Sequence, residues 1–453
     1  MRLMTSVVWL AVCCAAFVLA SCGDDGGGGG DAGTDSGTDT DTDTDADGSL
    51  EVLVLSESVS DDPAPAEGAL VTLDKPGGER VELTTGADGT VVFEGLDWAL
   101  GTASATASMD GHGMATHVGL TEADSPLTIR ILVQPVEMVE LSGTVTNMAD
   151  ESNWMRIDTV VPASTEYLGV GAPYSVEVPK DLPFAISAVE YTWLGLDQGG
   201  DETNVNWFLQ EMEPISEPTT YDITFSGGID LAEVSGSFDK LLTEGTPLSG
   251  SDGMGGLFAA VSWGAWATRW NGVVANLPWN AAVGVQTHVD INADGTAYDF
   301  SLEYMQDPFI EHYITVYVIY TGTYDLMGTV VREDGPPTDG SHAIDFLDVP
   351  VLPAPAESGA VELNGGALAW GSSETDARPE LLVVVGDYTW LIYGPVGATS
   401  LAPPVPPEGT PLTEPIINEQ LPAILNIVRD AENSTPELWL GARANSDSFI
   451  IKF

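Results

Sequence analysis

Three oxygen-bearing side chains alternate at Asp290, Asn292 and Asp294, directly before a glycine. This spacing lets alternate oxygens converge on one Ca²⁺, which prefers about six to eight oxygen ligands. The twelfth position of such a loop is Ser301 instead of a bidentate glutamate, and the same Ala-Asp-Gly-Thr sequence at 87–90 fits a hairpin turn. A turn is therefore the favoured interpretation. Calcium is the alternative, and no other cofactor is expected.

Two tryptophans, Trp266 and Trp270, stand four residues apart in the densest aromatic cluster of the chain. On a β-strand this spacing places both rings on one face, as in the sugar-stacking platforms of some carbohydrate-binding sandwiches. Small sandwiches also fill their cores with tryptophan. Burial is the favoured interpretation, and a carbohydrate platform is the alternative.

Motifs of known catalytic sites are missing or misplaced in the sequence. It contains no HExxH, nucleophile-elbow or P-loop pattern, and its GxGxxG at 28–33 has no strand before it. Because Asp and Glu number 69, adjacent acids are expected by chance, so no carboxylate pair stands out. We therefore expect a non-enzyme. An exported hydrolase with a site assembled from distant strands is a further alternative.

The N-terminus carries the most specific motif. Arg2 precedes an apolar run at 7–20 that is too short for an ordinary membrane span, and Leu19-Ala20-Ser21-Cys22 ends it. These residues resemble the lipobox of bacterial lipoprotein signal peptides. The resemblance implies that residues 1–21 are removed and that Cys22 is acylated as the new N-terminus. An ordinary secretory signal is the alternative.

Residues 22–48 follow as a linker that contains, after Cys22, only Gly, Asp, Thr, Ser and Ala. Nothing in it buries apolar area, so we expect it to be disordered and to span about 25–30 Å. The other cysteines, Cys13 and Cys14, lie in the predicted signal peptide, so the exported chain would form no disulfide. Gly23 follows Cys22 where lipoproteins retained at the inner membrane have Asp. The resemblance therefore implies the outer membrane or cell surface.

Charge restricts the partners. The 453 residues include 69 acidic and 13 basic side chains, for a formal net charge of −56. Such a surface repels nucleic-acid phosphates and anionic lipid headgroups, so we expect no nucleic-acid partner. The expected partners are the membrane, through the N-terminal lipid, and an envelope protein or polysaccharide.

Short apolar or alternating runs between Gly, Pro, Asp and Asn clusters predict an all-β body. The clearest runs lie at 50–55, 81–93, 127–133, 221–225, 313–320 and 381–385. Residues 419–429 differ, because their apolar positions recur at helical spacing and Pro422 suits a first helical turn. This segment predicts a short helix carrying Leu421, Ile424, Leu425 and Val428 on one face.

A degenerate repeat suggests how the body is divided. Gly143, Gly236 and Gly328 belong to similar strand starts that are 93 and 92 residues apart. A period of this size suits one small β-sandwich. We therefore expect tandem Ig-like or prealbumin-like β-sandwiches at residues 49–136, 137–229 and 230–322, and a β-rich C-terminal domain with the short helix at 323–453.

The first block has a pattern of its own. It contains Ala69-x-Val71-x-Leu73, Thr85-x-x-Asp88-Gly89-x-x-x-Phe93-x-x-Leu96, then Gly101 and Ala107-x-x-x-Gly111. This pattern resembles the carboxypeptidase regulatory-like domain, a prealbumin-like β-sandwich, and implies an accessory or binding module without an active site. The alternation itself directs Val71 and Phe93 inward, and Asp88-Gly89 predicts a tight hairpin turn with positive φ angles.

Together these features predict a lipid-anchored, non-catalytic protein of the bacterial cell envelope. Its expected role is to display β-sandwich modules for binding or adhesion. A carbohydrate-binding component that uses Trp266 and Trp270 is the main alternative.

Overall fold

The computed structural model is built of β-strands, and the all-β prediction is confirmed. It describes residues 48–57, 63–134, 136–150, 153–160, 164–168, 172–182, 184–193, 202–225, 231–239, 257–266, 289–291, 297–305, 311–321, 326–334, 340–343, 347, 350–353, 360–362, 366–408, 410, 420–430, 441–446 and 449–452. Within these ranges the helical elements are the single 3-10 turns η2 (Trp98–Leu100) and η3 (Glu122–Asp124). No helix in this part of the chain has the length and hydropathy needed to cross a bilayer.

The first sandwich packs two sheets around one apolar core. The first sheet contains β1 (Gly48–Glu57), β2 (Ala64–Pro65), β5 (Thr90–Leu96) and β8 (Leu127–Leu132). The second contains β3 (Leu70–Asp74), β4 (Arg80–Thr84), β6 (Ala103–Ser108) and β7 (Met114–Leu120). Leu50 and Phe93 of the first sheet and Leu73 of the second are at most 1% exposed in the shared core. A two-sheet sandwich is the architecture that the carboxypeptidase regulatory-like resemblance implies.

The predicted hairpin turn connects β4 to β5, although its backbone differs from the prediction in one respect. Gly89 has a φ of 74°, and a Cβ on it would lie 2.6 Å from the Val54 carbonyl oxygen, so both conformation and space require glycine. Asp88 is not among the described residues with a positive φ. Its carboxylate instead accepts hydrogen bonds from the Thr90 amide and hydroxyl at 3.0 and 2.7 Å, and the Thr90 hydroxyl bond chiefly lowers the Asp88 pKa.

Residues 138–224 form three smaller sheets with the orders β10-β17, β12-β11-β14-β15 and β13-β9-β16. Their strands are β9 (Met138–Gly143), β10 (Val145–Thr146), β11 (Trp154–Val160), β12 (Ser164–Leu168), β13 (Tyr174–Pro179), β14 (Phe184–Trp193), β15 (Glu202–Met212), β16 (Thr219–Thr220) and β17 (Ile223–Thr224). Alternation governs this region too, since Val176 and Val178 of β13, and Phe184 and Ile186 of β14, are buried at every second position of their strands.

The strands of the remaining chain are β18 (Leu231–Asp239), β19 (Leu257–Trp266), β20 (Val289–Ile291), β21 (Ala297–Met305), β22 (Glu311–Thr321), β23 (Leu326–Asp334), β24 (Gly340–Ala343), β25 (Ala360–Glu362), β26 (Leu368–Ala369), β27 (Arg378–Val385), β28 (Tyr388–Tyr393), β29 (Ser400–Leu401), β30 (Gln420–Asp430), β31 (Gly441–Asn445) and β32 (Phe449–Lys452). Two sheets have the orders β20-β21-β18-β24 and β26-β29.

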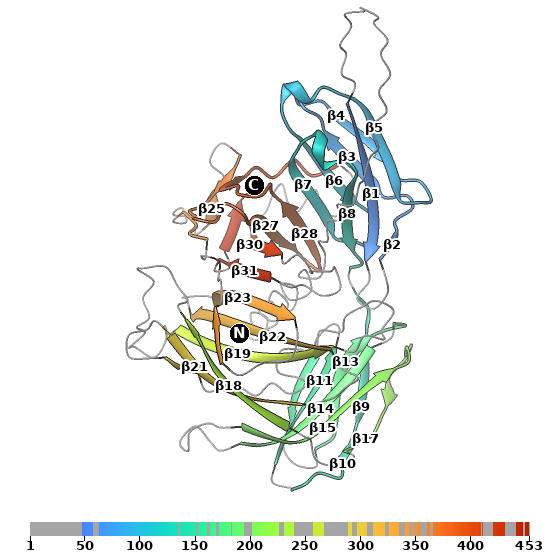
Figure 1. Cartoon of the computed structure of the whole chain (residues 1–453). Helices are drawn as coiled ribbons and strands as arrows, with labels where there is room; N and C mark the ends of the chain where they lie inside the picture. The colour runs from blue at the N-terminus through green and yellow to red at the C-terminus, as the bar shows by residue number, and fades with distance from the viewer. Residues whose placement is uncertain are drawn as a thin grey trace, which may run out of the picture.

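The longest sheet joins distant parts of the chain. Its order is β19-β22-β23-β31-β30-β27-β28-β7-β6-β3-β4, and beside this path β32 pairs with β30 and β25 pairs with β32. In Figure 1 the C-terminal strand β28 lies next to β7 of the first sandwich. The pairs β22–β23 and β28–β7 connect strands from different predicted blocks. The sheet is therefore continuous across these predicted block boundaries.

The predicted helix at 419–429 is wrong, because this segment forms β30 between β27 and β31. Leu425 and Val428 point to opposite faces of the strand, and both are buried. A strand covered on both faces shows no apolar–polar alternation, so its continuous apolar run also satisfies helical spacing. Pro422 stands near the start of the strand, before the pairing with β27 begins.

Candidate functional site where distant parts of the chain meet

The contact between residues 70–134 and residues 378–407 is named here the terminal junction. Its backbone frame is the parallel pairing of β7 with β28, which places Trp390 beside Met114 and Tyr393 beside His117. On one face of this frame, three C-terminal side chains join the apolar core of the first sandwich: Leu382, Leu391 and Tyr393. The junction therefore completes the core of the first sandwich with residues from near the end of the sequence.

Trp390 lies on the opposite face of the same frame and is fully buried. Its indole Nε1 donates to the Thr116 hydroxyl oxygen at 2.8 Å, and the hydroxyl oxygens of Thr116 and Thr106 are 2.9 Å apart. The two threonines are 0% and 3% exposed, although strand alternation places them on the outer face of their sheet. The junction thus turns a polar outer face into an interior with paired hydroxyl groups.

Gln134 marks the point where the chain leaves the first sandwich. Its side-chain Oε1 accepts from the Thr389 amide at 2.8 Å and from the Thr389 hydroxyl at 3.2 Å. These residues are 255 positions apart in the sequence. The hydrogen bonds therefore join the residue at which the chain leaves the first sandwich to a strand that packs on that sandwich much later in the chain.

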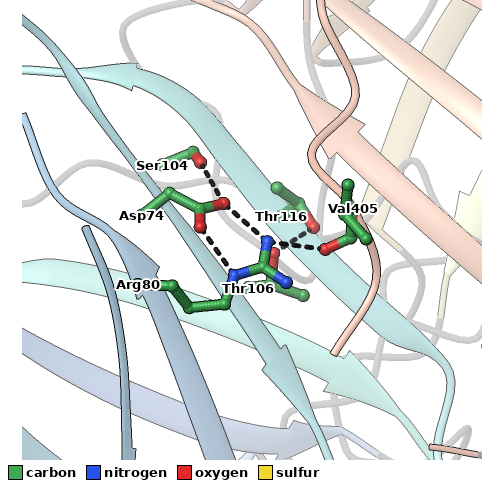
Figure 2. Close-up of polar contacts among 6 residues, drawn as sticks. All are labelled: Asp74, Arg80, Ser104, Thr106, Thr116 and Val405. Carbon is green, nitrogen blue, oxygen red and sulfur yellow. Dashed lines mark hydrogen bonds and ion pairs between the residues drawn. The ribbon is translucent and has the colours of Figure 1, made fainter. Parts of the chain in front are cut away.

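Arg80 connects the edge strand β4 to the proline-rich segment at 402–407 (Figure 2). The guanidinium donates to both oxygens of Asp74, with Nε–Oδ1 and Nη2–Oδ2 distances of 2.7 and 2.9 Å. Nη2 also donates to the Val405 carbonyl oxygen at 2.8 Å, while the Ser104 hydroxyl donates to Asp74 at 3.3 Å. The hydrogen bond to Asp74 is the main cause that raises the Arg80 pKa. This bidentate pair orients Arg80 to hold the main chain at Val405.

His117 stacks on Tyr393, with ring centroids 4.6 Å apart and an interplanar angle of 30°. The guanidinium carbon of Arg378 lies 5.3 Å from the centroid of the Tyr393 ring. Burial, followed by the positive charge of Arg378, lowers the His117 pKa to about 3, against a smaller opposing effect of Asp124. His117 is therefore neutral near pH 7 and packs as an aromatic ring.

This pKa makes the junction sensitive to acid. We expect its stability to fall as the pH drops from about 6.5 toward 3, because the unfolded chain takes up a proton that folded His117 does not. Since His117 is half-buried, the expected loss by pH 5 is about 1 kcal/mol. Urea midpoints measured between about pH 7 and pH 5 should fall less for His117→Gln than for the wild type. An identical pH dependence of the two proteins would contradict this assignment.

A second polar cluster surrounds Glu190 of β14, whose side chain is fully buried. Its carboxylate accepts from the Ala149 and Asp150 amides at 2.9–3.1 Å and from the Asn153 and Asn206 side-chain amides. Burial alone would raise the Glu190 pKa, but the four donors together outweigh it and lower the pKa. The ionised carboxylate thus ties Ala149, Asp150 and Asn153 to an inner strand of the sheet.

None of the residues singled out from the sequence is among the described members of these clusters. Cys22, Trp270, Asn292 and Asp294 are outside the described residues. For Trp266 the structure gives a backbone position, at the end of β19 and opposite Glu311. Asp290 lies in β20 opposite Asp299. The structure therefore tests neither predicted group, and both remain predictions.

The local sequence gave little indication of the polar clusters that the structure brings together. Thr106 and Thr116 read as ordinary outward positions of alternating strands, and Glu190 is one of 69 acidic residues. Trp390, which donates to Thr116, and the hydrogen-bond donors to Glu190 come from segments that are distant in the sequence. In the described ranges, no group of three or more His, Cys, Asp or Glu residues is placed to hold a metal ion. The arrangements at the terminal junction and around Glu190 hold chain segments together.

No family model matches the chain, and no curated protein matches it. Among solved structures, the chain is similar to the shaft pilin SpaA of Lactobacillus rhamnosus GG, with 9% identity over 41% of this chain and 100% of that one, at a TM-score of 0.16. A minor pilin of Streptococcus agalactiae matches with 13% identity over 39% and 95%, also at 0.16. A Ca²⁺-stabilised ice-binding adhesin of an Antarctic bacterium matches with 10% identity over 90% and 99%, at 0.15. With TM-scores this low, none of these proteins assigns a function to the chain.

Proposed function

We propose that the protein is a lipid-anchored, non-catalytic component of the cell envelope that displays β-sandwich modules for binding or adhesion. Cys22 carries the lipid in this proposal, at the outer membrane or cell surface. The acidic linker at 22–48 then holds the body away from the lipid.

One observation carries the non-catalytic part of the proposal. The polar groups of the terminal junction and of the Glu190 cluster are engaged in internal contacts. Asp74 and Arg80 hold the proline-rich segment, His117 packs against Tyr393, and Glu190 is saturated by four donors. These are the roles expected of a scaffold rather than of an active site.

The order of the elements supports the anchored part. Gly48, the last residue of the predicted linker, is the first residue of β1, so the linker would lead directly into the first sandwich. Trp98 packs so closely over this point that a Cβ on Gly48 would collide with its indole ring. The predicted attachment point is therefore packed against the body.

Acylation is tested by metabolic palmitate labelling of the protein expressed in a diderm bacterium. We expect the wild type to be labelled and its processing to be blocked by globomycin, and Cys22→Ser to lose both properties. Cys14→Ser, within the predicted signal peptide, is the matched control and should be labelled as the wild type is. A labelled Cys22→Ser protein, or a wild type released without label, would contradict the anchor.

Carbohydrate binding is a second candidate for the displayed activity. Trp266 is the last residue of β19. This strand is at the end of the strand order of the long sheet, and within that order its described neighbour is β22. If Trp266 and Trp270 form a platform, changing both to alanine should abolish binding on a glycan array. Trp154→Ala, which alters a tryptophan that is 38% exposed elsewhere, should leave binding unchanged. Binding that survives the double change would eliminate this platform.

Calcium binding by Asp290, Asn292 and Asp294 is a separate proposal that rests on their spacing alone. It requires the melting temperature to rise in millimolar calcium but not at matched ionic strength. A response that is equal in both solutions would leave these residues as a turn.

A further inference from the structure

The first and last strands of the first sandwich run side by side in the same direction. β1 pairs in parallel with β8, and the register extends from Val52 beside Leu127 to Glu57 beside Leu132. β1 is also the strand that follows the predicted linker, and β8 precedes the rest of the body. The covalent path from linker to body therefore enters and leaves through two adjacent parallel strands.

This direction decides how a pull acts on the sheet. Gly48 is at the starting end of β1, while Leu132 is at the finishing end of β8, so the two lie at opposite ends of the paired strands. Tension between them slides one strand along the other and loads the evenly spaced hydrogen bonds together. By contrast, Gly48 pairs with Leu96 of the antiparallel neighbour β5, and tension between those residues would open the pairs one after another.

The paired strands are also fastened by their side chains. Val52 and Val54 of β1 and Ile129 and Ile131 of β8 are at most 1% exposed in the core, so sliding would drag apolar side chains through a close-packed interior.

The exit end of the pair carries further contacts. The Val133 amide donates to the Glu57 carbonyl oxygen at 2.9 Å, which adds one bond beyond the last pair of β8. Ser56 Oγ and His112 Nε2 lie 2.8 Å apart. The Gln134 amide donates to the Gly111 carbonyl oxygen at 2.8 Å, and its side chain holds Thr389. Tension that arrives beyond β8 is thus shared with Gly111 and His112, which precede β7, and with Thr389 of β28.

We propose that the β1–β8 pair is a mechanical clamp that keeps the first sandwich folded when the body is pulled away from the membrane. The proposal rests on the proposed N-terminal anchor. It adds resistance to force as a property of the same attachment.

Single-molecule pulling on the chain from Cys22 to Phe453, produced without the first 21 residues and hence without lipid, tests the clamp. Cys22 is then the sole natural cysteine and serves as one handle. The second handle is Glu137→Cys for tension along β1 and β8, or Ala99→Cys for tension that opens β1 from β5. Both positions are exposed, so both proteins should fold.

We expect a rupture force several times higher with the handle at 137 than with the handle at 99. The length released identifies each event, because about 89 residues extend to roughly 300 Å and about 51 residues to roughly 170 Å. Equal forces, or a lower force at 137, would overturn the clamp. That result would leave the anchor intact, whereas a wild type without acylation would remove the anchor whatever the forces.

Discussion

Replacing Trp390 by alanine should destabilise the terminal junction by about 3–5 kcal/mol. The side chain is fully buried between the C-terminal strands and the outer face of the first sandwich, so its removal leaves a large cavity. The substitution also removes the indole N–H that donates a hydrogen bond to the Thr116 hydroxyl oxygen. The loss is measured as a lower urea midpoint for the transition that contains β7, followed by hydrogen exchange at the β7 amides.

Two further variants separate the causes. Trp390→Phe keeps an aromatic ring but lacks the N–H, so it should cost less than alanine, about 1–3 kcal/mol. Val396→Ala alters a side chain that is 65% exposed in the same region and should change stability by less than about 0.5 kcal/mol. If Trp390→Ala cost no more than Val396→Ala, Trp390 would not be the centre of the junction.

Replacing Glu190 by alanine should cost a similar amount, about 3–5 kcal/mol. The substitution removes an ionised acceptor and leaves four donors without their partner, of which the Asn153 and Asn206 side chains are buried and the Ala149 and Asp150 amides are partly exposed. Glu190→Gln preserves the shape but turns an amide N–H toward those donors, so it should recover only part of the loss. Thermal and urea unfolding of the sheet that contains β14 measure both effects.

The same cluster predicts how the proteins respond to pH. Because folding lowers the Glu190 pKa, its contribution is complete well above the ordinary value of about 4.5 and is lost as the pH falls through the folded value. Below that value Glu190→Gln and the wild type should converge in stability. Glu140→Gln, an exposed change on β9, should match the wild type within about 0.5 kcal/mol at neutral pH. A Glu190→Ala protein as stable as Glu140→Gln would show that the four donors do not depend on this carboxylate.

Local patterns predicted the parts of the fold that depend on neighbours in sequence. Alternation at Val71 and Leu73 identified an inward face, and the Asp88-Gly89 pair identified the turn before β5. The segment at 419–429 failed because burial on both faces of β30 removes the alternation that distinguishes a strand from a helix.

The terminal junction and the Glu190 cluster could not be predicted in this way. Trp390 and Thr116 are 274 positions apart, and no local spacing reports which distant strand will lie beside β7. Glu190 is distinguished by its four donors, which come from two other segments of the chain. In both places the decisive information is the register between distant strands.

The distance in sequence between β7 and β28 also has a consequence for synthesis and export. β7 is translated long before β28, and a secreted chain crosses the inner membrane in the same order. During that interval the edge of β7 that β28 later occupies has no partner from the C-terminal strands. Unpaired strand edges of this kind template wrong associations, and pairing between distant strands is slow. If the chain is exported as proposed, periplasmic chaperones that bind nascent β-edges should therefore increase the yield of the full chain, and most strongly when translocation is slowed.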